Sequence, residues 1–86
     1  MNIYKFKLAV SGVNTSLQLS SNSKILHVAT QMGIPHVWVL TDPNEPQIEV
    51  IINCYGTGEK VTDYSKYIGT LEVGAGYIFH YFENTL

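Results

Sequence analysis

Hydrophobic and polar residues alternate along most of the chain with the two-residue period of β-strands, and almost no apolar residues recur at helical spacing. The period is interrupted at regular intervals by clusters of glycine, proline, serine and asparagine, which are typical of turns. The strands expected from this pattern cover residues 2–10, 15–19, 25–32, 36–42, 47–55, 67–73 and 77–83. The polar segment 59–66 has no apolar period and has room for one helical turn.

Residues 24–42 predict a β-hairpin around which the rest of the chain is organised. Valine, isoleucine, threonine and tryptophan crowd both arms, as they do on half-buried sheet surfaces. Residues 33–35 predict the turn, because glycine adopts a positive φ and proline pushes its predecessor towards the extended region. The hairpin places His27 on one arm and His36 and Trp38 on the other.

Seven short strands at about ten-residue spacing, without a helical pattern, predict an all-β domain built as a small antiparallel sandwich or barrel. The 86 residues make a single domain, 1–86. The continuous apolar run Val50–Ile52 indicates burial on both faces of its strand or against a partner subunit. The expected core consists of Phe6, Leu8, Leu26, Val28, Val37, Val39, Ile51, Ile68 and either Phe79 or Phe82.

The charge of the chain excludes some partners. Five lysines, no arginine and seven acidic residues give a net charge of −2, which argues against DNA, RNA and anionic membranes as partners. Cys54 is the only cysteine, so no internal disulfide forms and a cytosolic setting is expected. The N-terminal residues lack a signal-peptide core, and no apolar run approaches the ~20 residues that span a bilayer. We therefore expect a soluble intracellular protein.

The residues with catalytic or metal-binding chemistry do not form a recognisable site. His27, His36 and His80 lie on three expected strands, but no close-spaced histidine pair of the kind found in metal sites occurs. Cys54 ends an apolar strand, where thiols are inert, and no turn presents a serine nucleophile. We expect no enzyme activity, no metal and no cofactor.

A binding site for a nucleotide-like ligand needs a wall for stacking and a place for an anion. The stacking wall is expected from Trp38 or from Tyr55, Tyr67 and Tyr81, although large aromatic rings also serve as core. Two glycines around Thr57 let backbone amides converge on an anion, with Lys60 near by, although the same residues also form plain β-turns. His27 and His80 are expected as hydrogen-bond donors. The candidate ligand-binding residues are His27, Trp38, Tyr55, Gly56, Thr57, Gly58, Lys60, Tyr67, His80 and Tyr81.

The order of several short motifs resembles a family of small tailed-phage proteins whose members have no assigned activity. The motifs are I-Y-K-F at 3–6, L-H-V-A at 26–29, Q-x-G-x-P-x-x-W at 31–38, T-D-P at 41–43, G-T-G at 56–58, Y-I-G-T at 67–70 and F-H-Y-F at 79–82. The resemblance covers nearly the whole chain and implies a phage origin and the cytoplasm of the infected host.

In size, charge and turn chemistry the chain is also similar to phage anti-defence proteins, the anti-Thoeris and anti-CBASS sponges, which sequester nucleotide-derived immune signals. It departs from that class in lacking arginine, the residue best suited to bidentate phosphate binding. The resemblance implies a homo-oligomeric, non-enzymatic binder of a small nucleotide-like ligand. The alternative is a phage inhibitor or host-takeover factor that binds a host protein through a β-edge or aromatic face.

Overall fold

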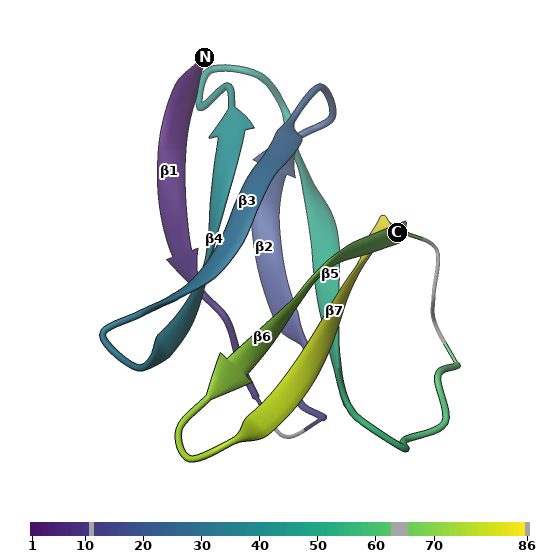
Figure 1. Cartoon of the computed structure of the whole chain (residues 1–86). Helices are drawn as coiled ribbons and strands as arrows, with labels where there is room; N and C mark the ends of the chain where they lie inside the picture. Colours follow the sequence, from purple (N-terminus) through teal and green to yellow (C-terminus); the bar gives the residue numbers. More distant parts are fainter. Residues whose placement is uncertain (11, 63–65, 86) are drawn as a thin grey trace.

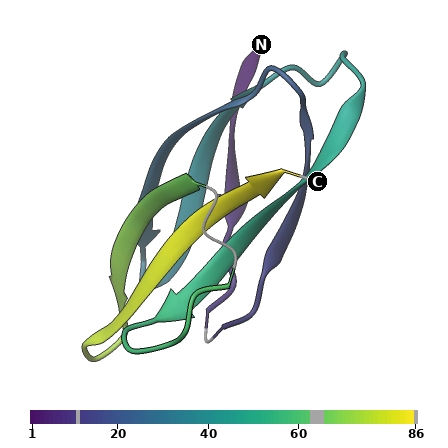
Figure 2. The same cartoon turned by 90° about the vertical axis from the view of Figure 1, so that its right-hand side faces the viewer.

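The computed structural model describes residues 1–10, 12–62 and 66–85, which form seven antiparallel strands and no helix. The strands are β1 (Asn2–Lys7), β2 (Thr15–Ser20), β3 (Lys24–Gln31), β4 (Ile34–Thr41), β5 (Gln47–Gly56), β6 (Lys66–Val73) and β7 (Tyr77–Thr85) (Figure 1). They build a three-stranded sheet A with the order β1-β4-β3 and a four-stranded sheet B with the order β2-β5-β7-β6. The two sheets pack as the layers of a small sandwich (Figure 2), which confirms the predicted all-β class.

The predicted hairpin is strands β3 and β4, and its turn begins one residue earlier than expected, at Met32, and ends at Gly33. Met32 and Gly33 have φ of 52° and 79° and form the two-residue turn with positive φ at both positions that suits the twist of a hairpin. Pro35 belongs to β4 and is buried, and its carbonyl oxygen accepts a hydrogen bond of 2.9 Å from the Leu8 amide. A proline is tolerated there because the pairing of β1 with β4 ends at His36.

The polar segment 59–66 contains no helix in its described residues, and the rest of it, 63–65, lies outside them. The expected helical turn therefore does not form in the described part. In addition, β1 ends at Lys7, three residues before the predicted boundary.

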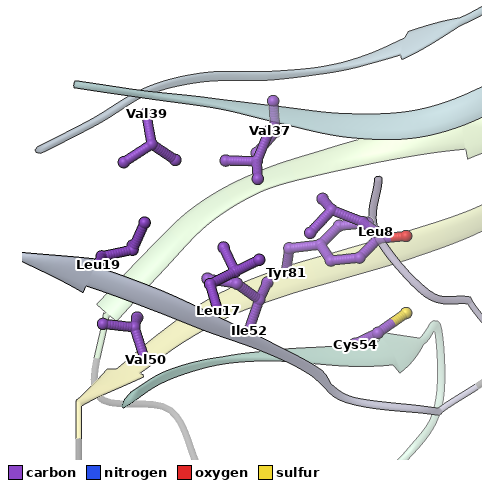
Figure 3. Close-up of a cluster of buried hydrophobic side chains, with 10 residues drawn as sticks. Leu8, Leu17, Leu19, Val37, Val39, Val50, Ile52, Cys54 and Tyr81 are labelled. Atoms are coloured by element: carbon purple, nitrogen blue, oxygen red, sulfur yellow. The ribbon is translucent and has the colours of Figure 1, made fainter. Parts of the chain in front are cut away.

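The core lies between the sheets and comes from alternate residues of the strands. On β4, Val37 and Val39 are fully buried, and Figure 3 shows them pointing towards the side chains of sheet B. The buried hydrophobic residues are Leu8, Leu17, Leu19, Val28, Val37, Val39, Val50, Ile52, Cys54 and Tyr81. Phe6, Ile68 and Phe79 pack against this cluster while partly exposed. Most of the predicted core is thus confirmed.

Two predicted core residues lie elsewhere. Leu26 is 44% exposed because it is an extra residue in the pairing of β3 with β4, between Ile25 and His27. Ile51 lies on the outer face because its neighbours Val50 and Ile52 both point inward. Val50 and Ile52 therefore fill the protomer's own core, whereas Ile51 is partly exposed on the outer face of sheet B.

The sheets approach each other most closely where β3 meets β6. A Cβ atom on Gly69 would overlap Cγ2 of Val28, so only glycine fits this position without a shift of Val28. Further along the same two strands, the Thr30 hydroxyl donates a 3.0 Å hydrogen bond to the Glu72 carbonyl. These contacts close one side of the sandwich.

Candidate functional site

The outer face of sheet A presents a single tryptophan at its centre, and we call it the Trp38 face. On the central strand β4, His36, Trp38 and Leu40 point away from the core because Val37 and Val39 point into it. In the register of the sheet, Trp38 lies between Lys5 on β1 and His27 on β3. The outward positions that form the Trp38 face are Ile3, Lys5, Lys7, Lys24, His27, Ala29, Gln31, His36, Trp38 and Leu40.

Two imidazole rings flank the indole. The His27 and His36 ring centroids lie 5.8 Å and 6.1 Å from that of Trp38, both in tilted orientations. Nδ1 of His36 lies 2.8 Å from the Ile34 carbonyl oxygen, which only accepts hydrogen bonds, so this nitrogen carries the proton. The three rings form an aromatic strip across β3 and β4 on the solvent side of the sheet.

The charges of the Trp38 face are all positive. Strands β1, β3 and β4 carry Lys5, Lys7 and Lys24 and no acidic residue, while the rest of the chain has two lysines and all seven acidic residues. The Lys5 ammonium donates a 2.7 Å hydrogen bond to Oε1 of Gln31 on β3, so this side chain crosses over β4. A chain of net charge −2 therefore has one locally basic face.

The outer face of sheet B, which we call the Tyr67 face, is built differently. Phe82 lies between Tyr55 and Tyr67, with ring centroids 5.8 Å and 5.6 Å away, in edge-to-face contacts. Beneath them on β5, Asn53 is 2% exposed, and its Oδ1 has no hydrogen-bond partner within the described part of the chain. We define the Tyr67 face by Asn53, Tyr55, Tyr67, Thr70, His80 and Phe82.

Hydroxyl groups from the turn after β5 and from β6 contact both ring nitrogens of His80 on the Tyr67 face. Nε2 of His80 lies 2.8 Å from the Thr57 hydroxyl, and Nδ1 lies 3.0 Å from the Thr70 hydroxyl. The Thr70 hydroxyl in turn lies 2.6 Å from that of Tyr67. Both ring nitrogens of His80 are therefore occupied by groups of the chain itself, which leaves this ring no free nitrogen for a ligand.

The glycine turn after β5 already contains a carboxylate. Oε1 of Glu59 accepts a 3.0 Å hydrogen bond from the Gly56 amide, and the Glu59 amide donates a 3.1 Å bond to the Gly56 carbonyl. The carboxylate thus occupies an amide that was expected to meet a ligand anion, and the plain turn describes this loop better. Gly58 has φ 92° in this turn, and Lys60 is exposed.

Beside the turn, Thr57 and residues of the β6–β7 hairpin line an open hollow of about 400 Å³. The lining consists of Gly56, Thr57, Gly76, Tyr77, Ile78 and Phe79. No lysine or histidine is part of this lining, so the hollow offers an anion only polar backbone and the hydroxyls of Thr57 and Tyr77.

The structure divides the predicted ligand-binding residues among three places. Tyr55, Gly56, Thr57, Gly58, Lys60, Tyr67 and His80 belong to the Tyr67 face and its adjoining turn, and His27 and Trp38 belong to the opposite, Trp38 face. Tyr81 is 1% exposed in the core, where its hydroxyl donates a 2.9 Å hydrogen bond to the Ala9 carbonyl. Burial raises the pKa of the Tyr81 phenol, and the neighbouring Cys54 raises it further. Tyr81 is therefore a core residue and no stacking wall.

The whole chain, residues 1–86, matches the family model described as a domain of unknown function, DUF7352. The chain belongs to this family. Comparisons with curated proteins and with solved structures gave no significant match. Within the described residues of this DUF7352 domain, no three histidine, cysteine or carboxylate side chains lie close enough to hold a metal ion. The same residues include no helix of the length and apolarity needed to cross a membrane.

Reasoning from the sequence placed His36 on the same arm as Trp38 but left it out of the ligand-binding residues, and it missed the three lysines of the Trp38 face. The pattern that reveals them is the alternation itself: residues 36, 38 and 40 share a face, as do 5 and 7. The absence of acidic residues from the three strands of sheet A is also readable in the sequence. What the sequence does not reveal is that β1 pairs with β4, which brings the lysines beside the tryptophan.

Proposed function

We propose that this protein binds a small anionic molecule with a planar ring, of the nucleotide class, on the Trp38 face, and that it does so without catalysing a reaction. One observation carries the proposal: Trp38, flanked by two histidine rings, lies on a face that has three lysines and no carboxylate. Planar bases stack on such rings with about 1–3 kcal/mol per base.

The charge distribution supports an anionic ligand. Within a chain that is acidic outside sheet A, the lysines give the Trp38 face a local positive potential, which attracts and orients an anion. Lysine binds phosphate as a point charge and not as a bidentate fork, so the expected affinity is moderate. Three lysines without arginine also suit one or two phosphates better than a long nucleic acid.

The arrangement of polar groups supports binding without catalysis. Thr57 and His80 pair a hydroxyl with an imidazole, as a nucleophile and its base do in an enzyme. In such enzymes a carboxylate orients the imidazole through its other nitrogen, whereas here that nitrogen lies beside the Thr70 hydroxyl. Cys54 is buried in the core. These groups stabilise the Tyr67 face and do not assemble a nucleophile.

An oligomer remains part of the proposal. An open sheet face covers a ligand from one side, whereas ligand sites bury about 70–90% of their ligand. A second copy closes the site, and the anionic ligand offsets the repulsion between two basic faces. On sheet A, the apolar surface that is exposed for such contacts includes Ile3, which is 62% exposed at the β1 edge.

The resemblance to small phage proteins supplies a biological setting for the proposal. In the cytoplasm of an infected host, a nucleotide-binding protein without catalytic groups acts by sequestering a nucleotide-derived immune signal. The second candidate is a host-protein inhibitor that uses the β1 edge, and it is favoured by the exposure of Ile3 and Tyr4 at 62% and 38%.

Trp38 is the only tryptophan of the chain, so its fluorescence reports directly on ligand at the proposed site. Titration with AMP, ADP-ribose and a cyclic dinucleotide is expected to give a saturable change with a Kd below ~100 μM for at least one of them, about −5.5 kcal/mol. If none binds in this range, the nucleotide proposal is wrong and the host-protein candidate replaces it.

Calorimetry with two leucine variants localises the binding. Trp38→Leu removes the stacking wall and is expected to abolish measurable binding. Tyr77→Leu changes an aromatic residue that is 68% exposed at the end of sheet B, and it is expected to leave the affinity unchanged. Equal losses in both variants would place the ligand elsewhere.

A further inference from the structure

A small hollow opens between the sheets beside the Trp38 face. Strands β3 and β6 run side by side in the same direction (Figure 1), and they touch at Val28 with Gly69 and at Thr30 with Glu72. Nearer their N-terminal ends the two strands separate around a hollow of about 180 Å³. Ile25, Leu26, His27, Lys66, Tyr67 and Ile68 line it, and we call it the bulge hollow.

Both strands carry an irregularity at this place. The pairing of β3 with β4 shifts between Ile25 and His27, and the pairing of β6 with β7 shifts between Tyr67 and Gly69. Each shift leaves one extra residue, Leu26 or Ile68. Such bulges occur next to functional sites, where they redirect side chains and free backbone groups from the ladder.

The polar groups of the bulge hollow suit an anion. β3 and β6 are the edge strands of their sheets, so each presents unpaired backbone amides along its outer side. His27 and Lys66 add two donor side chains, one of which also contacts Trp38. The carboxylate nearest in register is that of Glu83, the cross-strand partner of Lys66, and it is not among the lining residues.

We infer that the bulge hollow binds a phosphate group, between His27 and Lys66. This inference rests on the proposed function. It places the phosphate group of the nucleotide in the bulge hollow, while the base of the same nucleotide stacks on Trp38. The hollow is smaller than the ~300 Å³ of an ordinary small-molecule pocket, so it accommodates a phosphate but not a whole nucleotide. His27 links the two subsites, because its ring contacts Trp38 and its residue lines the hollow.

Inorganic phosphate tests the subsite without any nucleotide. In amide-resolved NMR of the full chain, millimolar phosphate is expected to shift the resonances of residues 26, 27, 67 and 68, and chloride at equal ionic strength is not. Lys66→Gln is expected to remove these shifts, whereas Lys60→Gln, which neutralises an exposed loop lysine, is expected to keep them. Unshifted resonances at these residues, or shifts that are the same in both variants, overturn the inference.

Titration with AMP and adenosine then separates the inference from the proposed function. Lys66→Gln is expected to weaken AMP binding about fivefold, the size of an exposed ion pair, and to leave adenosine binding unchanged. AMP binding that is insensitive to Lys66→Gln overturns the subsite while the stacking proposal stands. If neither ligand binds the wild type but phosphate shifts the hollow, the nucleotide function fails and the phosphate subsite stands.

Discussion

The two outer faces of the sandwich use similar side chains in opposite ways. On the Tyr67 face, aromatic rings pack edge to face, and the Thr57, His80, Thr70 and Tyr67 side chains form one hydrogen-bonded chain. On the Trp38 face, the aromatic rings beside the tryptophan are those of His27 and His36, and the surrounding charges are all lysines. His80 on the Tyr67 face is hydrogen-bonded at both ring nitrogens by groups of the chain itself, whereas the Trp38 face has lysines and no carboxylate.

This difference separates structural from functional aromatic residues. A network whose members are bonded to one another gains little from a ligand, because binding has to break existing contacts. A face of one charge sign is a cost to the isolated protein through repulsion, and an anionic ligand removes that cost. The number of aromatic side chains alone therefore does not identify the binding face.

The largest expected difference is in stability. Phe82→Ala removes the ring between Tyr55 and Tyr67 and is expected to lower the free energy of unfolding by about 3 kcal/mol, the lower end for phenylalanine because Phe82 is only half-buried. Trp38→Ala on the other face is expected to cost about half as much, since the two rings that flank Trp38 are themselves partly solvated. Urea denaturation of both variants measures the two costs, and a larger loss for Trp38→Ala would make the tryptophan a structural residue.

The fold followed from the sequence wherever the alternation was clean. The seven strands were predicted to within three residues at each end because one face of most strands is apolar and turns separate them. The errors lie where alternation fails or where pairing adds a residue. Ile51 lies in a continuous apolar run, where no alternation shows which residues point inward. The position of Leu26 depends on a register shift that is visible only in the pairing of β3 with β4.

The candidate site was harder to predict because it depends on which strands pair. Strand β7 has aromatic residues on both faces, so the sequence left open whether Tyr81 points inward, and in the structure it does. The glycine turn was predicted to hold an anion, but the chain supplies its own carboxylate from Glu59 two residues after Thr57. Trp38 and His27 were named, whereas the lysines around them require knowledge that β1 lies beside β4.

A smaller difference is expected between hydrogen bonds of the two faces. Thr70→Val preserves the shape of the side chain but removes the hydroxyl that links His80 to Tyr67, and it is expected to cost about 1 kcal/mol of stability. Gln31→Met on the Trp38 face removes the acceptor of the Lys5 ammonium and is expected to change stability by less than about 0.5 kcal/mol, because that bond is exposed. Thermal unfolding of the two variants at one pH gives the comparison. Equal costs would show that both faces are held together in the same way.

The smallest expected effect distinguishes the lysines of the two regions. Lys7→Gln neutralises one charge of the Trp38 face without touching Trp38, since Lys7 lies opposite His36 in the register. It is expected to weaken nucleotide binding by about 0.5 kcal/mol and to reduce the dependence of the affinity on salt, because this lysine adds to the positive potential of the face and salt screens that potential. Lys60→Gln makes the same chemical change in the exposed turn beside the Tyr67 face and is expected to alter neither quantity.

Affinity measured at three or more salt concentrations for the wild type and both variants gives the slopes of affinity against salt. If the two lysines change the slope equally, the ligand senses only the net charge of the protein, and the Trp38 face loses its special role.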